Sequence, residues 1–335
     1  MVLLDSAALS APAARHALPL GRGAAATSVG ISLPSRVVSS AEIEARLGLA
    51  PDWIERRTGI RNRRIAAPEE RLQTHAAAAA RQALDRAGVS ATDVDLVVVA
   101  TSTADEVMPA AAPLVAHEIG AFGAGAFDVG AACNGFLSAL AVGAAQVETG
   151  RARTALVVGA DFMSRVLDLD DRSTAAVFGD GAGAVLLEAI EGPSRLGPVV
   201  LGADAEGAGH IEIPRVDQWI RMRGHETYRE AVAHLSLATE QAVGAAGLRL
   251  QEIDLFVYHQ ANGRILTAVG ERLGLDPARV VDCIAEYGNT SAATLPLALD
   301  HAASHGLLHD GSRVLLGAFG AGFTWGAAVL EWGAA

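Results

Sequence analysis

The sequence predicts an α/β protein made of two duplicated halves, and an internal repeat is the main observation behind this prediction. Residues 82–99 and 241–258 share Gln, Ala, Ala, Gly, Asp, Leu and Val at one constant offset. Each copy is typical of a helix that ends at a glycine and is followed by a turn and an apolar strand. Strands that are apolar on both faces are typical of a sheet covered by helices on both sides.

The repeat continues beyond these segments. An Ala-rich helical segment follows Cys133 and leads to the apolar run 154–159, and a similar segment follows Asn289 and leads to 313–317. We therefore expect Cys133 and Asn289 to hold nearly equivalent positions, each at the start of a helix. The two halves would be related by a pseudo-twofold axis.

The Glu-Gly-Pro-Ser run that begins at residue 191 has the composition of a joint between the halves. We expect an N-terminal half over 26–190 that carries the cysteine. A C-terminal half over 191–335 would carry the histidine and asparagine discussed below. Residues 1–25 are rich in Ala, Pro, Gly and Ser without periodicity, and are predicted to form a flexible tail.

Composition excludes several classes of function. The chain has 335 residues, of which 51% are hydrophobic, with many Ala and Gly that favour close packing. The net charge of -12 argues against nucleic acid as a partner. All 26 basic residues are arginine, which excludes a Schiff-base lysine and leaves arginine to bind anions such as phosphate.

Cys133 and Cys283 are too few for a disulfide framework or a Cys-rich zinc site, so we expect a reducing cytoplasm and no metal. The N-terminus is a poor signal peptide because Asp5 interrupts it early. The uncharged run 129–147 is long enough to suggest a membrane span. It is mostly Ala and Gly with three polar residues, which favours a buried helix and no membrane association.

Three short segments carry the residues suited to catalysis. Cys133 lies in Ala-Ala-Cys-Asn-Gly-Phe, His259 in His-Gln-Ala-Asn, and Asn289 in Gly-Asn-Thr-Ser. Alone, a cysteine is more often a small buried hydrophobe and a histidine is more often structural. The first two segments follow apolar strands and the third opens a helix of the matching half. Because ligands bind at the carboxyl ends of such strands, we expect the three residues to meet in one crevice between the halves.

These residue types suit acyl chemistry on sulfur. A helix N-terminus would lower the pKa of Cys133 and favour its thiolate. Its own N–H, and a second N–H from Ala321 in the Gly-rich turn 319–326, would bind the thioester oxygen. That turn resembles a nucleotide loop only weakly. His259 and Asn289 together would stabilise the enolate left when a malonyl group loses CO2, since Asn is a neutral donor and not a base.

These motifs resemble those of the β-ketoacyl-acyl-carrier-protein synthase III family, which has a thiolase-like fold. The resemblance rests on Ala-Ala-Cys-x-Gly-Phe, His-Gln-Ala-Asn, Gly-Asn-Thr-Ser-Ala-Ala and Phe-Gly-x-Gly-Phe-Thr-Trp-Gly. It includes Trp-Ile-x-x-Arg-Thr-Gly-Ile-Arg from Trp53 and Phe-Gly-Asp-Gly-Ala-Gly-Ala from Phe178, and covers the chain from about Thr27 to Trp332. It implies two duplicated α/β halves in a layered αβαβα arrangement.

The resemblance also implies an activity. An acyl-CoA primer would transfer its acyl group to Cys133. A malonyl thioester, carried by acyl carrier protein or by CoA, would then decarboxylate against His259 and Asn289, and the enolate would attack the acyl-cysteine. This decarboxylative Claisen condensation would begin a fatty-acid or polyketide chain in a homodimer, and no cofactor beyond these substrates would be needed.

By position in the resemblance, Trp53, Arg57 and Arg172 would bracket the CoA nucleotide, and Asn262 would lie near the pantetheine arm. Read in isolation, Trp53 fits the apolar face of an amphipathic helix. Arg172 in Asp-Asp-Arg equally fits a surface ion pair.

The contacts with a carrier protein would come from Arg229, Arg264 and Arg272. Glu271 stands where a basic residue is common in the family. This departure leaves open a free CoA or a modular carrier domain as the carrier of the malonyl group.

The acyl pocket would include Met163, Phe178 and Ile211, together with Met108 from the partner subunit. Met108 stands where the family commonly has Phe. Because methionine is flexible, we expect a roomier and more tolerant primer pocket than in an acetyl-specific enzyme.

Two other functions compete with condensation. An acyltransferase would pass the acyl group of Cys133 to an oxygen or nitrogen acceptor without decarboxylation. Asn289 argues against this because simple transfer needs no enolate. A non-catalytic partner subunit is the second alternative, and the intact Cys133, His259 and Asn289 argue against it.

Overall fold

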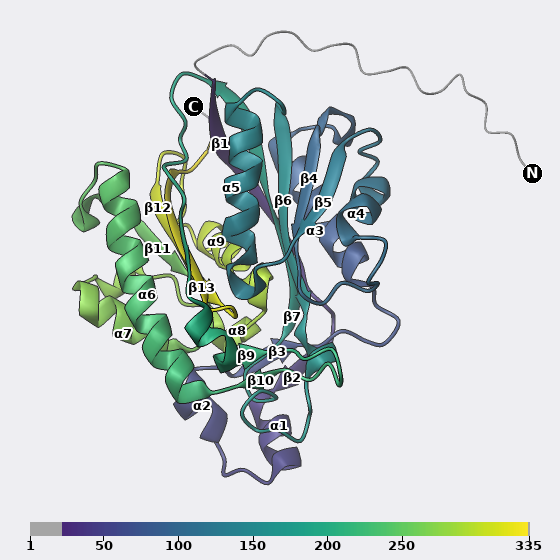
Figure 1. Ribbon diagram of the computed structural model, residues 1–335, viewed down its shortest axis with the longest axis vertical. Helices are drawn as coiled ribbons and strands as arrows, with labels where there is room; N and C mark the ends of the chain where they lie inside the picture. Colours follow the sequence, from purple (N-terminus) through teal and green to yellow (C-terminus); the bar gives the residue numbers. More distant parts are fainter. Residues whose placement is uncertain (1–21, 334–335) are drawn as a thin grey trace, which may run out of the picture.

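The computed structural model describes residues 22–333, which form alternating helical layers and β-sheets (Figure 1). The N-terminal sheet has the strand order β1-β7-β6-β4-β5. These strands are β1 (Arg22–Ser32), β7 (Asp180–Glu191), β6 (Thr154–Phe162), β4 (Leu96–Ala100) and β5 (Gly125–Val129). The β4 strand is buried at every position because helices cover both faces of the sheet, as its unbroken apolar run predicts.

The C-terminal sheet repeats this arrangement with one strand fewer, in the order β11-β12-β13-β8. Its strands are β11 (Leu255–Tyr258), β12 (Arg313–Gly320), β13 (Thr324–Glu331) and β8 (Val200–Ala203). In both sheets a parallel pair, β4–β6 or β11–β12, leads into an antiparallel neighbour. The place of β5 is marked only by a single parallel bridge between Phe256 and Val280.

Six long helices complete five layers. The outer helices α3 (Leu72–Ala87) and α4 (Ala111–Ile119) cover one face of the N-terminal sheet. The central helices α5 (Gly135–Glu148) and α9 (Thr294–Ser304) lie between the sheets, and α6 (Gly224–Ala245) and α7 (Gly263–Leu273) cover the C-terminal sheet. The predicted αβαβα arrangement of two duplicated halves is therefore confirmed.

The short elements gather at one end of the molecule, below the sheets in Figure 1. They pack around a small apolar cluster of their own, which includes Ile54, Met163 and Phe178. They are α1 (Ser40–Leu47), α2 (Trp53–Thr58), α8 (Ile284–Tyr287), the ribbon of β2 (Val37–Ser39) with β3 (Asn62–Arg64), and the ribbon of β9 (Ile211–Glu212) with β10 (Arg221–Met222).

The sequence repeat has a structural counterpart at Asp95 and Asp254. The Asp95 carboxylate accepts the backbone N–H of Arg153 at 2.7 Å, and the Asp254 carboxylate accepts that of Arg313 at 2.8 Å. Each aspartate thus holds the start of the neighbouring parallel strand. The spacing that relates these aspartates relates the rest of the two halves as well.

The termini of the halves differ in part from the prediction. Residues 1–21 of the predicted tail lie outside the described residues, but residues 22–25 begin β1, so the tail prediction is wrong for them. Arg22 pairs with Glu191 and Ala25 with Glu188, and this long-range pairing orders a run without local periodicity. The β7 strand ends at Glu191, and the first strand of the C-terminal sheet begins at Val200.

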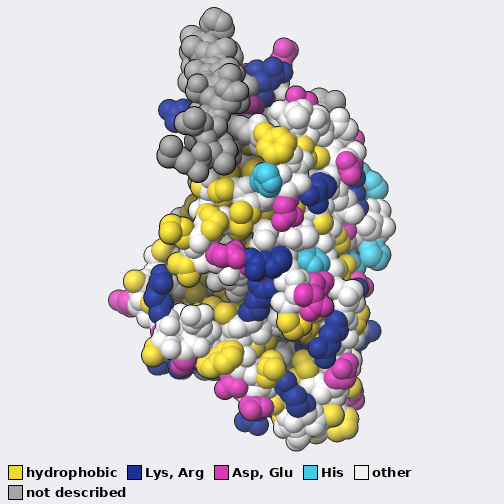
Figure 2. Space-filling model, turned by 90° about the vertical axis from the view of Figure 1, so that its right-hand side faces the viewer, with side chains coloured by type: hydrophobic (Ala, Val, Ile, Leu, Met, Phe, Trp, Pro, Cys, Tyr) yellow, Lys and Arg dark blue, Asp and Glu magenta, His cyan; other side chains and the backbone are white. Residues whose placement is uncertain are grey.

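The face that carries β5 and α4 exposes several large apolar side chains. Phe122 is 74% exposed, and Phe127 on β5 is 39% exposed. Val107 and Met108, in the loop between β4 and α4, are 95% and 85% exposed. Figure 2 shows hydrophobic side chains gathered on this face beside a hollow. No helix within residues 22–333 is long and apolar enough to cross a membrane.

Candidate active site

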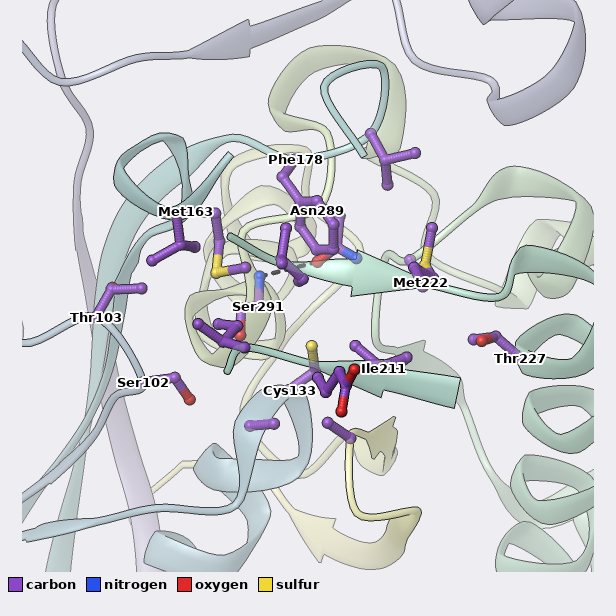
Figure 3. A pocket seen from close by; sticks show the side chains of 18 of the residues that line it. Ser102, Thr103, Cys133, Met163, Phe178, Ile211, Met222, Thr227, Asn289 and Ser291 are labelled. Atoms are coloured by element: carbon purple, nitrogen blue, oxygen red, sulfur yellow. Dashed lines mark hydrogen bonds between the residues drawn. The ribbon is translucent and has the colours of Figure 1, made fainter. Parts of the chain in front are cut away.

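One cavity of about 1390 Å³ brings the three candidate catalytic residues together. Cys133, His259 and Asn289 all line it, although they come from different elements of the two halves. Figure 3 shows Cys133 and Asn289 facing this pocket. The crevice expected between the halves is therefore present.

Cys133 lies in a 3-10 turn, Ala132–Asn134, directly before α5. Ala132 has a φ of 48°, in the left-handed region. The turn packs against Gly320 at the end of β12, where an added Cβ would lie 2.8 Å from the Cys133 nitrogen. Ala321 follows directly and lines the same pocket, so both predicted oxyanion donors lie at the nucleophile's wall.

The ionisation of Cys133 differs from the expectation. Burial raises the pKa of its thiol to about 12, and the charge of Asp161 raises it further, while an interaction with Ser291 lowers it. The predicted lowering of the pKa is wrong because loss of water around the sulfur outweighs the helix start. Cys133 is still partly exposed to the pocket, so the resting nucleophile is an accessible neutral thiol.

His259 follows β11 directly and is 1% exposed. Its backbone N–H donates to the Gly317 carbonyl at 2.8 Å, and its ring packs edge-to-face on Phe319 with centroids 5.4 Å apart. Burial lowers its pKa to about 3, so the imidazole is neutral. Neither ring nitrogen has a hydrogen-bond partner among the described residues, which leaves both for a ligand in the pocket.

The amide of Asn289 has a fixed orientation. Its backbone bonds to the segment before β7, since the Asn289 N–H donates to Val177 and its carbonyl accepts from Gly179. Its side-chain oxygen accepts the Ser291 N–H at 2.9 Å, drawn as a dashed line in Figure 3. Because a backbone N–H can only donate, the atom facing it is the oxygen and the NH2 group is left to donate elsewhere.

The predicted equivalence of Cys133 and Asn289 needs correction. Cys133 lies inside its turn, whereas Asn289 precedes the matching turn Ser291–Ala293, and α9 begins only at Thr294. Ser291 has a φ of 52°, which matches Ala132, so the counterpart of Cys133 is Ala292. The sequence alone does not show where a 3-10 turn begins.

The candidate CoA-binding residues cluster at α2. The guanidinium of Arg57 lies 4.3 Å from the ring centroid of Trp53, and that of Arg172 lies 6.0 Å from it. The side chain of Asn262 caps α7 by accepting the Arg264 N–H at 3.0 Å. Arg57 and Asn262 also line the cavity, so the cluster adjoins its mouth.

The remaining candidates divide into two groups. The candidate pocket residues Met163, Phe178 and Ile211 line the cavity. So do Arg229 and Arg264, both exposed, whereas Arg272 is exposed in the last turn of α7 away from the lining. Met108 is outside the lining of its own chain, and its contact with a partner subunit stays a prediction.

Sequence reasoning missed several residues of this site. Asp161, at the end of β6, is fully buried and accepts hydrogen bonds from Ser102, Thr103 and Ala292. A carboxylate inside an otherwise apolar strand was an available signal. Met222 on β10 also lines the cavity, but no local pattern marks that ribbon. Among the described residues no group of His, Cys, Asp or Glu side chains is arranged to hold a metal ion.

The layered fold and the pocket together define a thiolase-like enzyme with a cysteine nucleophile. Two family models match the chain: 3-oxoacyl-[acyl-carrier-protein] synthase III over residues 127–205, and its C-terminal part over residues 243–332. The β-ketoacyl-[acyl-carrier-protein] synthase III of Chelativorans sp. (strain BNC1) is 43% identical over 315 residues, covering 91% of this chain and 98% of that protein. Synthase III 2 of Streptomyces coelicolor is 45% identical, covering 93% and 95%.

Solved structures agree. The 3-oxoacyl-(acyl carrier protein) synthase III of Pseudomonas aeruginosa PAO1 has a TM-score of 0.89 and 41% identity, covering 93% of this chain and 99% of that chain. The priming β-ketosynthase from the R1128 polyketide biosynthetic pathway has a TM-score of 0.90 and 40% identity, covering 96% and 99%. The chain belongs to the β-ketoacyl-[acyl-carrier-protein] synthase III family.

Proposed function

We propose that this enzyme loads the acyl group of an acyl-CoA primer onto Cys133 and condenses it with a malonyl thioester, releasing CO2. The reaction would begin a fatty-acid or polyketide chain. The observation that carries this proposal is the fixed amide of Asn289. Its NH2 group and the neutral His259 ring can donate to one thioester oxygen in the cavity that Cys133 lines.

In the first step, the Cys133 sulfur attacks the acyl carbon of the primer. The resting thiol is neutral because burial raises its pKa to about 12, so it loses its proton as the attack proceeds. The N–H groups of Cys133 and Ala321 are placed to bind the developing oxyanion. The CoA sulfur leaves with the bonding electron pair and takes the proton.

In the second step, the malonyl carboxylate leaves as CO2 and its bonding pair forms the enolate. His259 and Asn289 donate to the enolate oxygen, and the enolate carbon then attacks the acyl carbon on Cys133. The sulfur leaves with its bonding pair. Neutral donors suffice because Phe319 and the buried surroundings of His259 exclude water and strengthen each hydrogen bond.

The CoA nucleotide of the primer would lie against Trp53, Arg57 and Arg172. Stacking on the ring and contacts between guanidinium groups and phosphate suit an adenine diphosphate. Arg229 and Arg264 at the cavity would meet the phosphopantetheine of either acyl carrier protein or CoA, with Arg272 as a more distant carrier contact.

A homodimer would pair β5 with a second copy, since β5 ends its sheet and exposes Phe127 beside Phe122. The exposed Met108 would then reach the partner's acyl pocket and make it tolerant of primers larger than acetyl. Both Cys133 and Cys283 are free, which fits an enzyme of the reducing cytoplasm.

Intact mass after incubation with acetyl-, isobutyryl- and longer acyl-CoAs tests the loading step. We expect an added acyl mass that is absent in Cys133→Ala, and loading of more than one primer. Release of CO2 from malonyl thioesters then tests condensation. Loading without CO2 release would instead favour an acyltransferase to an oxygen or nitrogen acceptor, and strict acetyl preference would contradict the role given to Met108.

A further inference from the structure

Ser291 occupies a demanding backbone position beside the nucleophile. Its φ of 52° lies in the left-handed region, where glycine is favoured over any residue with a Cβ. It is 2% exposed, yet it lines the active-site cavity. A strained residue of this kind persists where its surroundings hold it, so its contacts are informative.

Ser291 contacts three functional groups at once. Its backbone N–H orients the Asn289 amide at 2.9 Å (Figure 3). Its hydroxyl lies within hydrogen-bonding reach of the Cys133 thiol and of the Asp161 carboxylate. One residue therefore joins the nucleophile, the amide that acts on the second substrate, and a buried acid.

Asp161 is fixed from both sides of the crevice. One of its oxygens accepts the Ser102 N–H at 2.8 Å and the Thr103 hydroxyl at 2.9 Å, and the other accepts the Ala292 N–H at 3.1 Å. Because each oxygen accepts a backbone N–H, the carboxylate cannot turn away. It gives the Ser291 hydroxyl an acceptor in a fixed place.

The matching turn of the N-terminal half shows that the turn itself does not require this pair. At the same repeat spacing, Ala132 stands in place of Ser291 and Gly320 in place of Asp161. Ala132 adopts the same left-handed conformation with no hydroxyl, and Gly320 has no side chain. The hydroxyl and carboxylate are therefore features of the site and not of the turn.

We propose that Ser291 is a further catalytic residue, whose hydroxyl donates a hydrogen bond to the Cys133 sulfur when that sulfur carries negative charge. Asp161 is its positioning residue. The inference rests on the proposed function. In acyl transfer the Cys133 S–H bond breaks, the sulfur–acyl bond forms, and the CoA sulfur leaves with its electron pair and takes the proton.

In condensation the new carbon–carbon bond forms as the sulfur–acyl bond breaks, and the Cys133 sulfur leaves with the electron pair. In both steps the Ser291 hydroxyl rotates from the Asp161 carboxylate to the charged sulfur. It returns to the carboxylate when the sulfur is acylated or protonated.

Ser291→Ala and Ser291→Gly test the hydroxyl, since both remove it and only the glycine also relieves the left-handed backbone. Cys133 alkylation by iodoacetamide, followed against pH without any acyl substrate, reports the thiolate. We expect both variants to react about tenfold more slowly at a given pH, as for a thiol pKa raised by about one unit. Ser236→Ala removes another buried hydroxyl, which bonds to Val232, and should react like wild type.

Alkylation at the wild-type rate in the two variants would overturn the proposal. So would slow alkylation in the alanine variant alone, because relief of strain would then explain the effect. Since alkylation uses no acyl substrate, its outcome is independent of the proposed function. In addition, acyl loading should fall at least fivefold more than CO2 release, because the N–H that orients Asn289 remains in both variants, and equal losses would contradict the assignment.

Asp161→Asn tests the positioning role through coupling. In that background, Ser291→Ala should slow alkylation less than about threefold, because the hydroxyl has already lost its fixed acceptor. A full tenfold effect in both backgrounds would show that Asp161 does not act through Ser291.

Discussion

The two turns that precede the central helices have the same backbone and different chemistry. Ala132–Asn134 before α5 and Ser291–Ala293 before α9 each begin with a residue in the left-handed region. In the C-terminal half, the Ala292 N–H donates to the Asp161 carboxylate at 3.1 Å. Its counterpart in the N-terminal half is the N–H of Cys133, which faces Gly320.

This difference teaches how a duplicated scaffold becomes a catalyst. One turn has its N–H occupied by a carboxylate and serves to hold Asn289. The other has glycine where that carboxylate would stand, so its N–H can serve a substrate oxygen beside the nucleophile. The outer edges differ too, since β5 is complete in one half and reduced to the Phe256–Val280 bridge in the other.

The largest expected effect removes the nucleophile and makes its turn resemble that of the C-terminal half. Cys133→Ala should abolish acyl loading and lower the condensation rate by at least about 10⁴-fold. Intact mass and CO2 release measure the two. Cys283→Ala is the matched control, because Cys283 is buried outside the cavity and should still permit loading. Acyl mass on the Cys133→Ala protein would disprove the assigned nucleophile.

The next effect separates the second turn from the first. Asn289→Asp keeps the acceptor for the Ser291 N–H but aims a negative oxygen at the developing enolate. We expect CO2 release from a malonyl thioester to fall about 10³-fold, with a far smaller loss of acyl loading. Asn62→Asp on β3, outside the cavity lining, is the matched control. A loss confined to acyl loading would reverse the roles assigned to the two turns.

Gly320→Ala tests whether the N-terminal turn needs the space beside its N–H. The added Cβ would lie 2.8 Å from the Cys133 nitrogen and 3.0 Å from that of Asn134, so the turn must shift. We expect acyl loading to slow about 100-fold, as when one oxyanion donor is lost. Gly270→Ala on α7 meets no atom within 4 Å and should load normally. Unchanged loading in Gly320→Ala would exclude the Cys133 N–H as a necessary donor.

The smallest expected effect concerns stability and the buried His259. Its pKa of about 3 in the folded protein lies below the unfolded value of about 6.5, so below pH 6.5 the unfolded state binds a proton that the folded state does not. The free energy of unfolding should therefore fall by up to about 1.4 kcal/mol per pH unit from 6.5 towards 3.

Denaturant unfolding between pH 7 and 5 measures this slope, with the non-titrating His259→Gln as the control that cancels other groups. The wild-type curve should be steeper than that of the variant. Parallel curves would mean that His259 is solvated, and that its neutrality is not set by burial.

Sequence reasoning predicted the fold correctly where the pattern was local. The repeat around Asp95 and Asp254, and the apolar runs that became β4 and β11, were sufficient to predict two similar sheets between helical layers. The start of β1 was missed because its order comes from pairing with β7, far along the chain. The loss of a β5 counterpart leaves no local signature either.

The candidate site was predicted in its members and not in its details. The three motifs identified Cys133, His259 and Asn289, which the structure brings to one cavity. The pKa of Cys133 was predicted in the wrong direction, because helix position can be read locally whereas desolvation depends on everything packed around the sulfur. Ser291 stood within a quoted motif, but its left-handed backbone and its reach to Asp161 could not be read there.

The sequence by itself determined the duplicated α/β architecture and the residue types that meet between its halves, since periodicity and spacing along the chain encode both. Only the tertiary structure decided which N–H beside Cys133 is left for a substrate, which way the Asn289 amide points, and that the thiol and the imidazole rest uncharged. Those properties arise from burial and from hydrogen bonds between segments distant in sequence, such as Asp161 with Ala292.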